Sequence, residues 1–186
     1  MSKQPKADSR EAALLERIAT LEAGQDEFAL AIALGELVDY YWEIGRYQNA
    51  EAPMVRRLAL FRHTRGHKHT TVARCLHDLA FLYDNLLRDA EVEDFAAEAL
   101  ALWVKIDGYA NGHATSMMEL LARVFVRQGR HEKLRALFTA AIAEIERDYP
   151  RGYHDSSLAR LAMLLGGDDR GAELRSIAAR IRSLLD

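Results

Sequence analysis

The stretch Leu79-Ala80-Phe81-Leu82-Tyr83 recurs in altered form 42 residues before and 42 residues after itself. The earlier copy is Leu37-Val38-Asp39-Tyr40-Tyr41, and the later copy is Leu121-Ala122-Arg123-Val124-Phe125. Each copy begins with leucine, continues with a small or branched apolar residue and ends with an aromatic residue. Self-similarity at one fixed period of this length indicates a repeat protein.

A short turn with arginine at the same place follows each copy. The three turns are Gly45-Arg46-Tyr47, Leu87-Arg88-Asp89 and Gly129-Arg130-His131. Apolar residues on either side of each turn lie mostly 3, 4 and 7 positions apart, which is the spacing of one helix face. Each period therefore predicts two helices joined by a tight turn. Such a unit buries its apolar face only when a neighbouring unit stacks on it.

Residues that end and cap helices recur at the same period. The predicted helix breaks are Gly24, Gly66, Gly108 and Pro150. Gly24 is expected just past the end of its helix, and Pro53 is expected within the first turns of a helix. The predicted N-caps are Asp26 for the first repeat, Thr70 or His69 for the second, and Asn111 for the third.

These signals divide one continuous domain into three parts. Residues 1–24 form a polar tail and an N-terminal helix, residues 25–150 form three 42-residue repeats, and residues 151–186 form a divergent C-terminal capping helix pair. The apolar stripe of Leu14, Ile18 and Leu21 on the N-terminal helix needs a partner surface. That surface is either the next helix or a second copy of the chain.

Composition narrows the class of protein. The 186 residues are 49 % hydrophobic and 28 % charged, which is ordinary for a soluble globular chain, and the net charge of −3 is too small to indicate nucleic acid or a membrane. The single cysteine, Cys75, fits a reducing compartment, and no apolar stretch resembles a signal peptide or a membrane span. We therefore expect a cytoplasmic location. The excess of arginine over lysine is associated with bacterial genomes of high GC content.

The segment from Tyr41 to Glu51, Tyr-Trp-Glu-Ile-Gly-Arg-Tyr-Gln-Asn-Ala-Glu, resembles the tetratricopeptide repeat (TPR). The 42-residue period, with Gly66-His67-Lys68-His69 before the second unit, is similar to the longer repeats of kinesin light chains. The chain departs from the pattern at a few positions. Leu87 stands for the turn glycine, Arg57 for a small packed residue, and Val92 and Leu134 for alanine.

The resemblance implies an all-α fold, a right-handed superhelix of antiparallel helix pairs that forms an α-solenoid. It also implies that the first helix of each pair lines a concave groove, which binds an extended or helical peptide of a partner protein without catalysis or a cofactor. The groove positions carried over from the family are Asp39, Trp42, Glu43, His77, Phe81, Asp84, Asn85, Ser116, Glu119, Arg123 and Arg127. The other interpretation of these residues is an ordinary solvated helix face.

The two tryptophans are expected to differ in role. Trp103 aligns with Phe61 and Ile145, which predicts a core position. Trp42 aligns with Asp84 and Val126, a position without a steady apolar demand, and is a candidate partner contact.

Two clusters invite another chemistry. The set of His63, His67, His69, Cys75 and His77 contains metal-ligand types, but its spacing matches no standard zinc site, so no metal is predicted. The basic stretch from Arg56 to Arg74 suits either an acidic partner or neighbouring acidic helices, and we favour the helices.

The sequence thus predicts a protein-binding scaffold. The main alternative is a self-associating structural protein, a homodimer formed through the N-terminal helix. An enzyme or a nucleic-acid-linked regulator is disfavoured because phosphate-loop, zinc-protease and nucleophile-elbow motifs are missing from the sequence.

Overall fold

The computed structural model describes residues 9–109 and 112–148, with the side chains of residues 145, 146 and 148 excepted. Further along the chain it describes Ala162, Met163, Arg175, Ser176, Ala178, Ala179 and Arg182. The expected cap Asn111, the expected break Pro150 and nearly all of the predicted capping pair lie outside the described residues.

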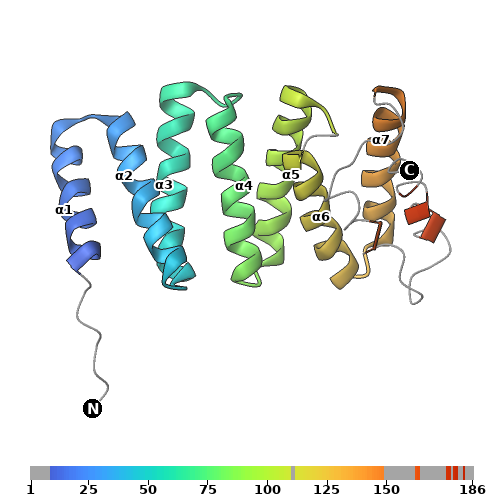
Figure 1. Ribbon diagram of the computed structural model, residues 1–186, viewed down its shortest axis with the longest axis horizontal. Coiled ribbons are helices and arrows are strands. Elements are labelled where there is room, and N and C mark those ends of the chain that lie inside the picture. Colours follow the sequence, from blue (N-terminus) through green and yellow to red (C-terminus); the bar gives the residue numbers. More distant parts are fainter. Residues whose placement is uncertain are drawn as a thin grey trace, which may run out of the picture. The chain divides into compact units, whose positions relative to one another are not determined.

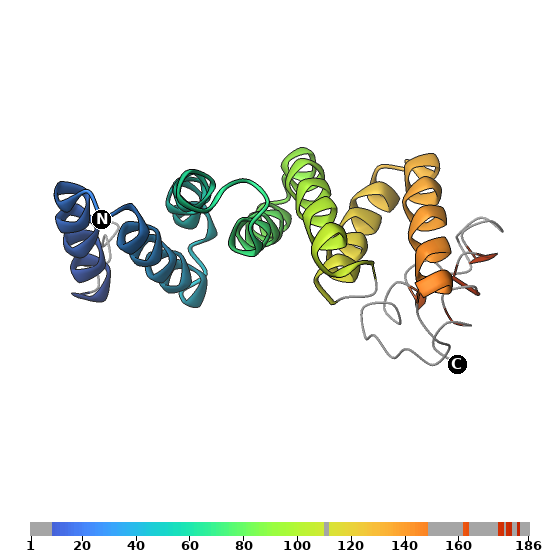
Figure 2. The same ribbon diagram turned by 90° about the horizontal axis from the view of Figure 1, so that it is seen from above.

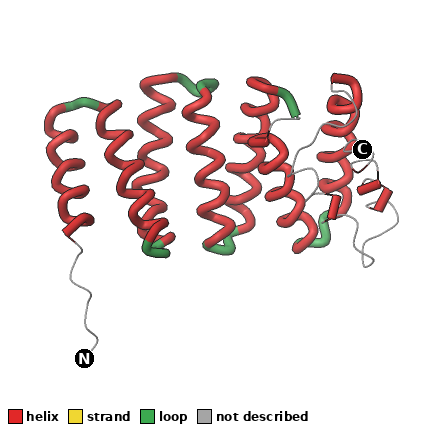
Figure 3. Tube along the Cα trace, in the orientation of Figure 1, coloured by secondary structure: helices red, strands yellow, loops and turns green. Residues whose placement is uncertain are grey.

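The longer described segments form seven α-helices (Figure 1). These are α1 (Ser9–Gly24), α2 (Glu27–Glu43), α3 (Tyr47–Arg65), α4 (Thr70–Asn85), α5 (Asp89–Asp107), α6 (Gly112–Arg127) and α7 (His131–Asp148). The same residues contain no β-strand, as Figure 3 shows. Helices α3, α5 and α7 begin 42 residues apart, each directly after the turn arginine. The all-α prediction is confirmed, and the sequence period is a period of helix starts.

The chain divides into two compact units, Met1–Leu87 and Arg88–Asp186. Helices α1 to α4 belong to the first unit, and α5 to α7 belong to the second. The boundary falls in the turn of the second predicted repeat, between Leu87 and Arg88.

In the first unit, consecutive helices pack on one another along the chain, α1 on α2, α2 on α3 and α3 on α4. Seen from above, α3 stands in a second row beside α2 and α4 (Figure 2). The repeated leucines fill the space between the helices, since Leu34, Leu37, Leu58, Leu76 and Leu79 are each at most 4 % exposed. Each fully buried leucine contributes about 1.5–3 kcal/mol to folding, so this core holds the four helices in place.

In the second unit, α6 packs against both α5 and α7. Trp103 of α5 is 4 % exposed and stacks on the His113 ring of α6, with ring centroids 4.2 Å apart. The prediction that Trp103 is a core residue is therefore confirmed.

The helix caps follow the sequence with one shift. The Asp26 carboxylate accepts the Ala29 backbone N–H at 3.0 Å, which confirms this cap, and the His69 ring accepts the Thr71 N–H at 3.1 Å. His69 rather than Thr70 is therefore the second cap. Gly24 lies inside its helix as the last residue of α1 and not beyond it, and Gln25 takes the left-handed φ of 56°. The chain must reverse at Gln25 because the next residue already caps α2.

The turns after α2, α4 and α6 share a left-handed residue at equivalent positions. Gly45 has a φ of 70°, Leu87 of 57° and Gly129 of 66°. Glycine adopts this conformation without steric cost, whereas leucine does not. Pro53 lies in the second turn of α3 as its seventh residue, so α3 lacks one interior backbone donor.

No described helix combines the length and the apolar character that crossing a membrane requires.

Candidate functional site

A cavity of about 410 Å³ opens in the first unit between α2, α3 and α4. It is lined by Val38, Asp39, Trp42, Met54, Arg57, His77, Asp78 and Phe81. Four of the predicted groove residues, two from α2 and two from α4, therefore lie around one cavity. Helical spacing brings them there, because residues three and four positions apart share a helix face. Val38 and Met54, at 3 % and 1 % exposed, join the cavity to the core.

Arg57 reaches this cavity from α3 because Gly35 of α2 has no side chain. A Cβ atom on Gly35 would lie 3.0 Å from the Arg57 Cζ and 3.1 Å from its Nε. The guanidinium also lies over the Phe61 ring, 5.5 Å from its centroid. Arg57 thus places a positive charge between α2 and α4, although it belongs to the helix behind them. Sequence reasoning missed this role and identified Arg57 only as a departure from the repeat pattern.

Two carboxylates share the cavity. Burial raises the pKa of Asp78 above its ordinary value, and the nearby Asp39 charge raises it further, whereas Arg57 and Arg74 act in the opposite direction. Neither the Asp39 nor the Asp78 carboxylate forms a hydrogen bond or ion pair with any residue that the structure describes. Asp78 is therefore a half-buried carboxylate whose oxygens lack a partner within the described part of the chain.

Aromatic rings form the walls. The Trp42 indole packs edge-on against Tyr47 at the start of α3, with centroids 5.1 Å apart. The Phe81 ring lies 5.1 Å from the His77 ring on the same helix. Trp42 and Phe81 are both half-buried, so each offers part of its surface to a ligand.

The other predicted groove residues have different surroundings. Glu43 forms an ion pair with Arg10 of α1 at 2.5 Å, and the Asn85 amide donates to the Phe81 carbonyl at 2.8 Å. Asp84 is half-buried on α4. Among the described residues that line the cavity, none comes from α6, the helix that carries Ser116, Glu119, Arg123 and Arg127. Arg127 forms an ion pair with Asp89 at 2.5 Å.

Two exposed apolar residues extend the same face of α2. Phe28 is 45 % exposed and Ile32 is 39 % exposed, and they precede Asp39 by three and two helical turns. Arg65 of α3 lies over the Phe28 ring, 4.7 Å from its centroid. Sequence reasoning missed both residues, although the spacing of 4 and 7 positions on α2 was the available signal.

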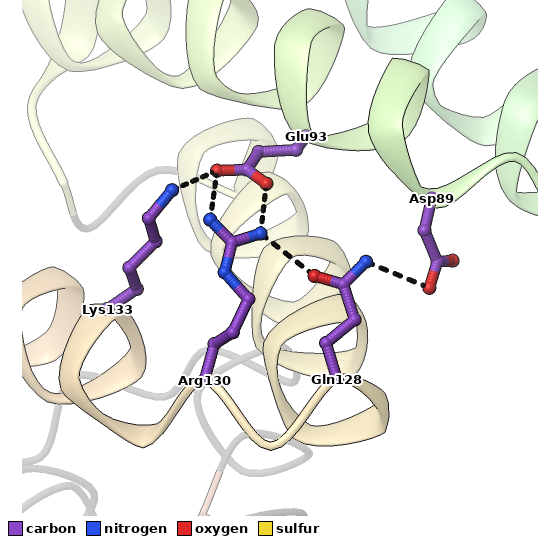
Figure 4. A network of polar contacts seen from close by, with 5 residues as sticks. All are labelled: Asp89, Glu93, Gln128, Arg130 and Lys133. Atoms are coloured by element: carbon purple, nitrogen blue, oxygen red, sulfur yellow. Dashed lines mark hydrogen bonds and ion pairs between the residues drawn. The ribbon is translucent and has the colours of Figure 1, made fainter.

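The recurring turn arginines connect helices instead of facing the cavity. In the second unit, Arg130 contacts both oxygens of Glu93, and the Lys133 ammonium lies 2.7 Å from the same carboxylate (Figure 4). Arg130 also donates to the Gln128 side chain at 2.8 Å, and Gln128 donates to Asp89 at 3.3 Å. The hydrogen bond from Arg130 lowers the pKa of Glu93 below its ordinary value.

The first unit has a related contact at the same register. Arg46 lies 3.3 Å from Glu11 of α1, and the Tyr41 hydroxyl donates to this glutamate at 2.8 Å. Burial and the bond to Glu11 raise the pKa of Tyr41 to about 12. Phe125 occupies the Tyr41 position in the second unit, where Arg130 lies over its ring instead. A turn arginine thus ties its helix to an earlier one in both units.

The basic stretch from Arg56 to Arg74 meets acidic residues of its own unit. Arg56 of α3 forms an ion pair with Glu22 of α1, and the His63 ring nitrogen lies 2.6 Å from Glu27 of α2. These contacts favour the interpretation that neighbouring helices carry complementary charge.

The remaining alternatives also have a structural outcome. Ile18 of the N-terminal stripe is 6 % exposed, and an ion pair of 2.5 Å between Arg17 and Glu36 ties α1 to α2. The stripe therefore packs within the chain. Within the described residues, no three histidine, cysteine or acidic side chains gather as a metal site requires. Cys75 is buried, and burial raises the pKa of its thiol to about 11.

No protein-family model and no curated protein matches this sequence. Solved structures do match. The chain is similar to a Podosopora anserina protein assigned as a kinesin light chain with nearly identical TPR-like repeats, at 18 % identity and a TM-score of 0.72 over 94 % of this chain and 84 % of that chain. A single-residue variant of that protein gives the same values. The fold is TPR-like.

A second TPR-like neighbour is BtubC (BKLC) from P. vanneervenii, at 19 % identity and a TM-score of 0.62. The match covers 84 % of this chain but only 65 % of that protein. At these identities the likeness shows the fold alone. A TPR-like fold suggests a protein-interaction scaffold and is typically non-catalytic.

Proposed function

We propose that this TPR-like protein is a non-catalytic interaction scaffold, and that a segment of a partner protein binds in the cavity between α2, α3 and α4. The observation that carries the proposal is the lining of this cavity, which combines two partly exposed aromatic rings with charged groups on helices held by a buried leucine core. Protein interfaces take most of their binding energy from a few such aromatic and charged residues.

The chemistry of the lining supports binding over catalysis. The described lining residues include no serine, threonine or cysteine to act as a nucleophile. Two aspartates and a histidine titrate there, but the two carboxylates lie with Arg57 in a cavity whose remaining walls are apolar or aromatic. That combination orients a bound side chain by charge and holds it by apolar contact.

The three-repeat division of residues 25–150 and the capping pair at 151–186 remain our proposal for the organisation of the chain. The regular starts of α3, α5 and α7 support the repeats. We also propose that Ser116, Glu119, Arg123 and Arg127 on α6 contribute to partner binding, because α6 is the counterpart of α2 and α4 in the repeat register.

The test selects peptides from a random displayed library on the wild-type protein and then measures their affinities by calorimetry. We expect Trp42→Ala and Phe81→Ala each to weaken the selected peptides at least about tenfold, which corresponds to about 1.4 kcal/mol. Leu15→Ala on α1 is the control, because Leu15 is 47 % exposed and lies away from the cavity lining.

Each variant must first show the helical circular dichroism and thermal transition of the wild type. Peptides that bind the Trp42→Ala and Phe81→Ala proteins as tightly as the wild type would remove the cavity from the function. Equal losses in all three variants would point to a general change in stability and would count against the cavity as well.

A further inference from the structure

The cavity between α2, α3 and α4 carries more negative than positive charge. Asp39 and Asp78 both line it, and Arg57 is the one lysine or arginine among the described lining residues. The two carboxylates lie close enough that the Asp39 charge disfavours ionisation of Asp78. An incoming cation would relieve this repulsion, whereas an incoming anion would add to it.

Arg57 does not offset this excess through direct contact. Its guanidinium lies against the backbone of Gly35 on one side and over the Phe61 ring on the other. Its Nε is buried and has no hydrogen-bond acceptor among the described residues. Arg57 contacts neither carboxylate at ion-pair distance within the described part of the chain, so both remain available to a ligand.

The walls suit a long cationic side chain. Trp42 on α2 and Phe81 on α4 are half-buried and flank the same cavity as the two aspartates. Lysine and arginine bury their aliphatic stems on apolar surface while their charged ends reach a polar group. Aromatic faces also attract a cation directly, an effect that grows when water is excluded from the site.

We propose that the cavity binds a lysine or arginine side chain of the partner segment, with its charged end at Asp39 and Asp78 and its stem against Trp42 and Phe81. The inference rests on the proposed function and specifies the side chain that anchors the partner.

The test uses single-residue probes, N-acetyl-lysine amide and N-acetyl-arginine amide, titrated into the full chain. The readout is the NMR signal of the Trp42 indole N–H, and the Trp103 indole, which is 4 % exposed in the second unit, is the internal reference. We expect a saturable shift of the Trp42 signal alone, which weakens as salt is added because the attraction is between charges.

Two variants test the anchors. Asp39→Asn and Asp78→Asn keep the shape of the side chain and remove the charge, and each is expected to weaken the lysine probe about tenfold, or about 1.4 kcal/mol. Asp94→Asn on α5 is the matched control, because Asp94 is exposed and lies outside the cavity lining. Thermal melts of all three variants establish that each is folded before titration.

Neutral and acidic probes separate the alternatives. If N-acetyl-glutamate amide shifts Trp42 as strongly as the lysine probe, the site is one for anions at Arg57 and the inference is overturned. An equal shift with N-acetyl-norleucine amide, or no saturable shift with any probe, overturns it as well. The scaffold function can survive these results, because library peptides that depend on Trp42 and Phe81 but lack a basic residue would still support it.

Discussion

At one position of the repeat, the first unit pairs an arginine with a facing glycine, whereas the second unit pairs an alanine with a glutamate. In the first unit, Gly35 of α2 leaves room for Arg57 of α3. Two 42-residue periods later, Glu119 is half-buried on α6 and Ala141 is fully buried on α7. In these two units, a charged side chain enters from the second helix of a pair only where the first helix gives up its own side chain. That exchange puts Arg57 into the cavity of the first unit.

The largest expected effect comes from placing the arginine of the first unit into the second. Ala141→Arg puts a long charged side chain at a site that is 0 % exposed and has no facing glycine. We expect a loss of about 3–5 kcal/mol in the free energy of unfolding, because overpacking and an unpaired buried charge add to each other. Urea denaturation followed by circular dichroism measures it.

Ala143→Arg is the matched control, since Ala143 is on the same helix and exposed. Its cost should stay within about 0.5 kcal/mol. Equal costs at positions 141 and 143 would show that the second unit accommodates arginine without a facing glycine, and the comparison between the units would be wrong.

The two turn contacts should differ next most. Glu93→Gln removes the charge that Arg130 and Lys133 share, whereas Glu11→Gln leaves an amide oxygen for Tyr41 and disturbs one cation, Arg46. We expect Glu93→Gln to cost about 0.5–1 kcal/mol, because solvent screens these pairs, and Glu11→Gln to cost less. Urea midpoints at neutral pH compare the two variants.

The pH dependence of Glu93→Gln follows from the lowered pKa of Glu93. A carboxylate whose folded pKa lies below its unfolded value stabilises the fold above the unfolded value of 4.5 and loses that contribution as pH falls through the folded pKa. The difference between wild type and Glu93→Gln should therefore close in acid. A difference that persists unchanged at about pH 2 would assign it to packing instead of charge.

The repeat spacing, the helix starts and the burial of Trp103 could all be predicted from sequence, because they depend on residues close together on one helix. The clustering of Asp39 and Phe81 around one cavity could be anticipated for the same reason. The role of Arg57 could not, since it depends on the absence of a side chain 22 residues earlier on another helix. Asp78 was missed because its desolvation is a tertiary effect that spacing does not encode.

A smaller effect tests the contact between Gly35 and Arg57 directly. Gly35→Ala gains about 1 kcal/mol of helix propensity but pushes a Cβ against the flexible end of Arg57 at 3.0 Å. We expect the two effects nearly to cancel in the wild type. In an Arg57→Ala background the contact is gone, and Gly35→Ala should stabilise the protein by up to about 1 kcal/mol.

Gly24→Ala calibrates the propensity gain, because it lies in α1 and a Cβ there meets nothing within 4 Å. Chemical denaturation of the four proteins in the cycle gives the coupling energy. A coupling of zero would mean that Arg57 does not depend on Gly35 for its place, and its route into the cavity would need another explanation.

The smallest expected effect lies at Leu87, the last residue of the first unit. Its φ of 57° matches the left-handed Gly45 and Gly129, but a side chain there costs about 1 kcal/mol. Leu87→Gly removes this strain and adds unfolded-state entropy worth about 0.4–1 kcal/mol, so we expect a net stabilisation of at most about 0.5 kcal/mol. The side chain is 82 % exposed, so little apolar contact is lost.

Leu86→Gly is the matched control, because Leu86 has a φ of −86° and is half-buried, and its replacement should destabilise the protein. Thermal melts distinguish the two signs. A loss of stability at Leu87 equal to that at Leu86 would mean that the Leu87 side chain stabilises the fold by more than its backbone strain costs. The leucine would then be a packed residue at the end of the first unit, where Gly45 and Gly129 serve only as turns.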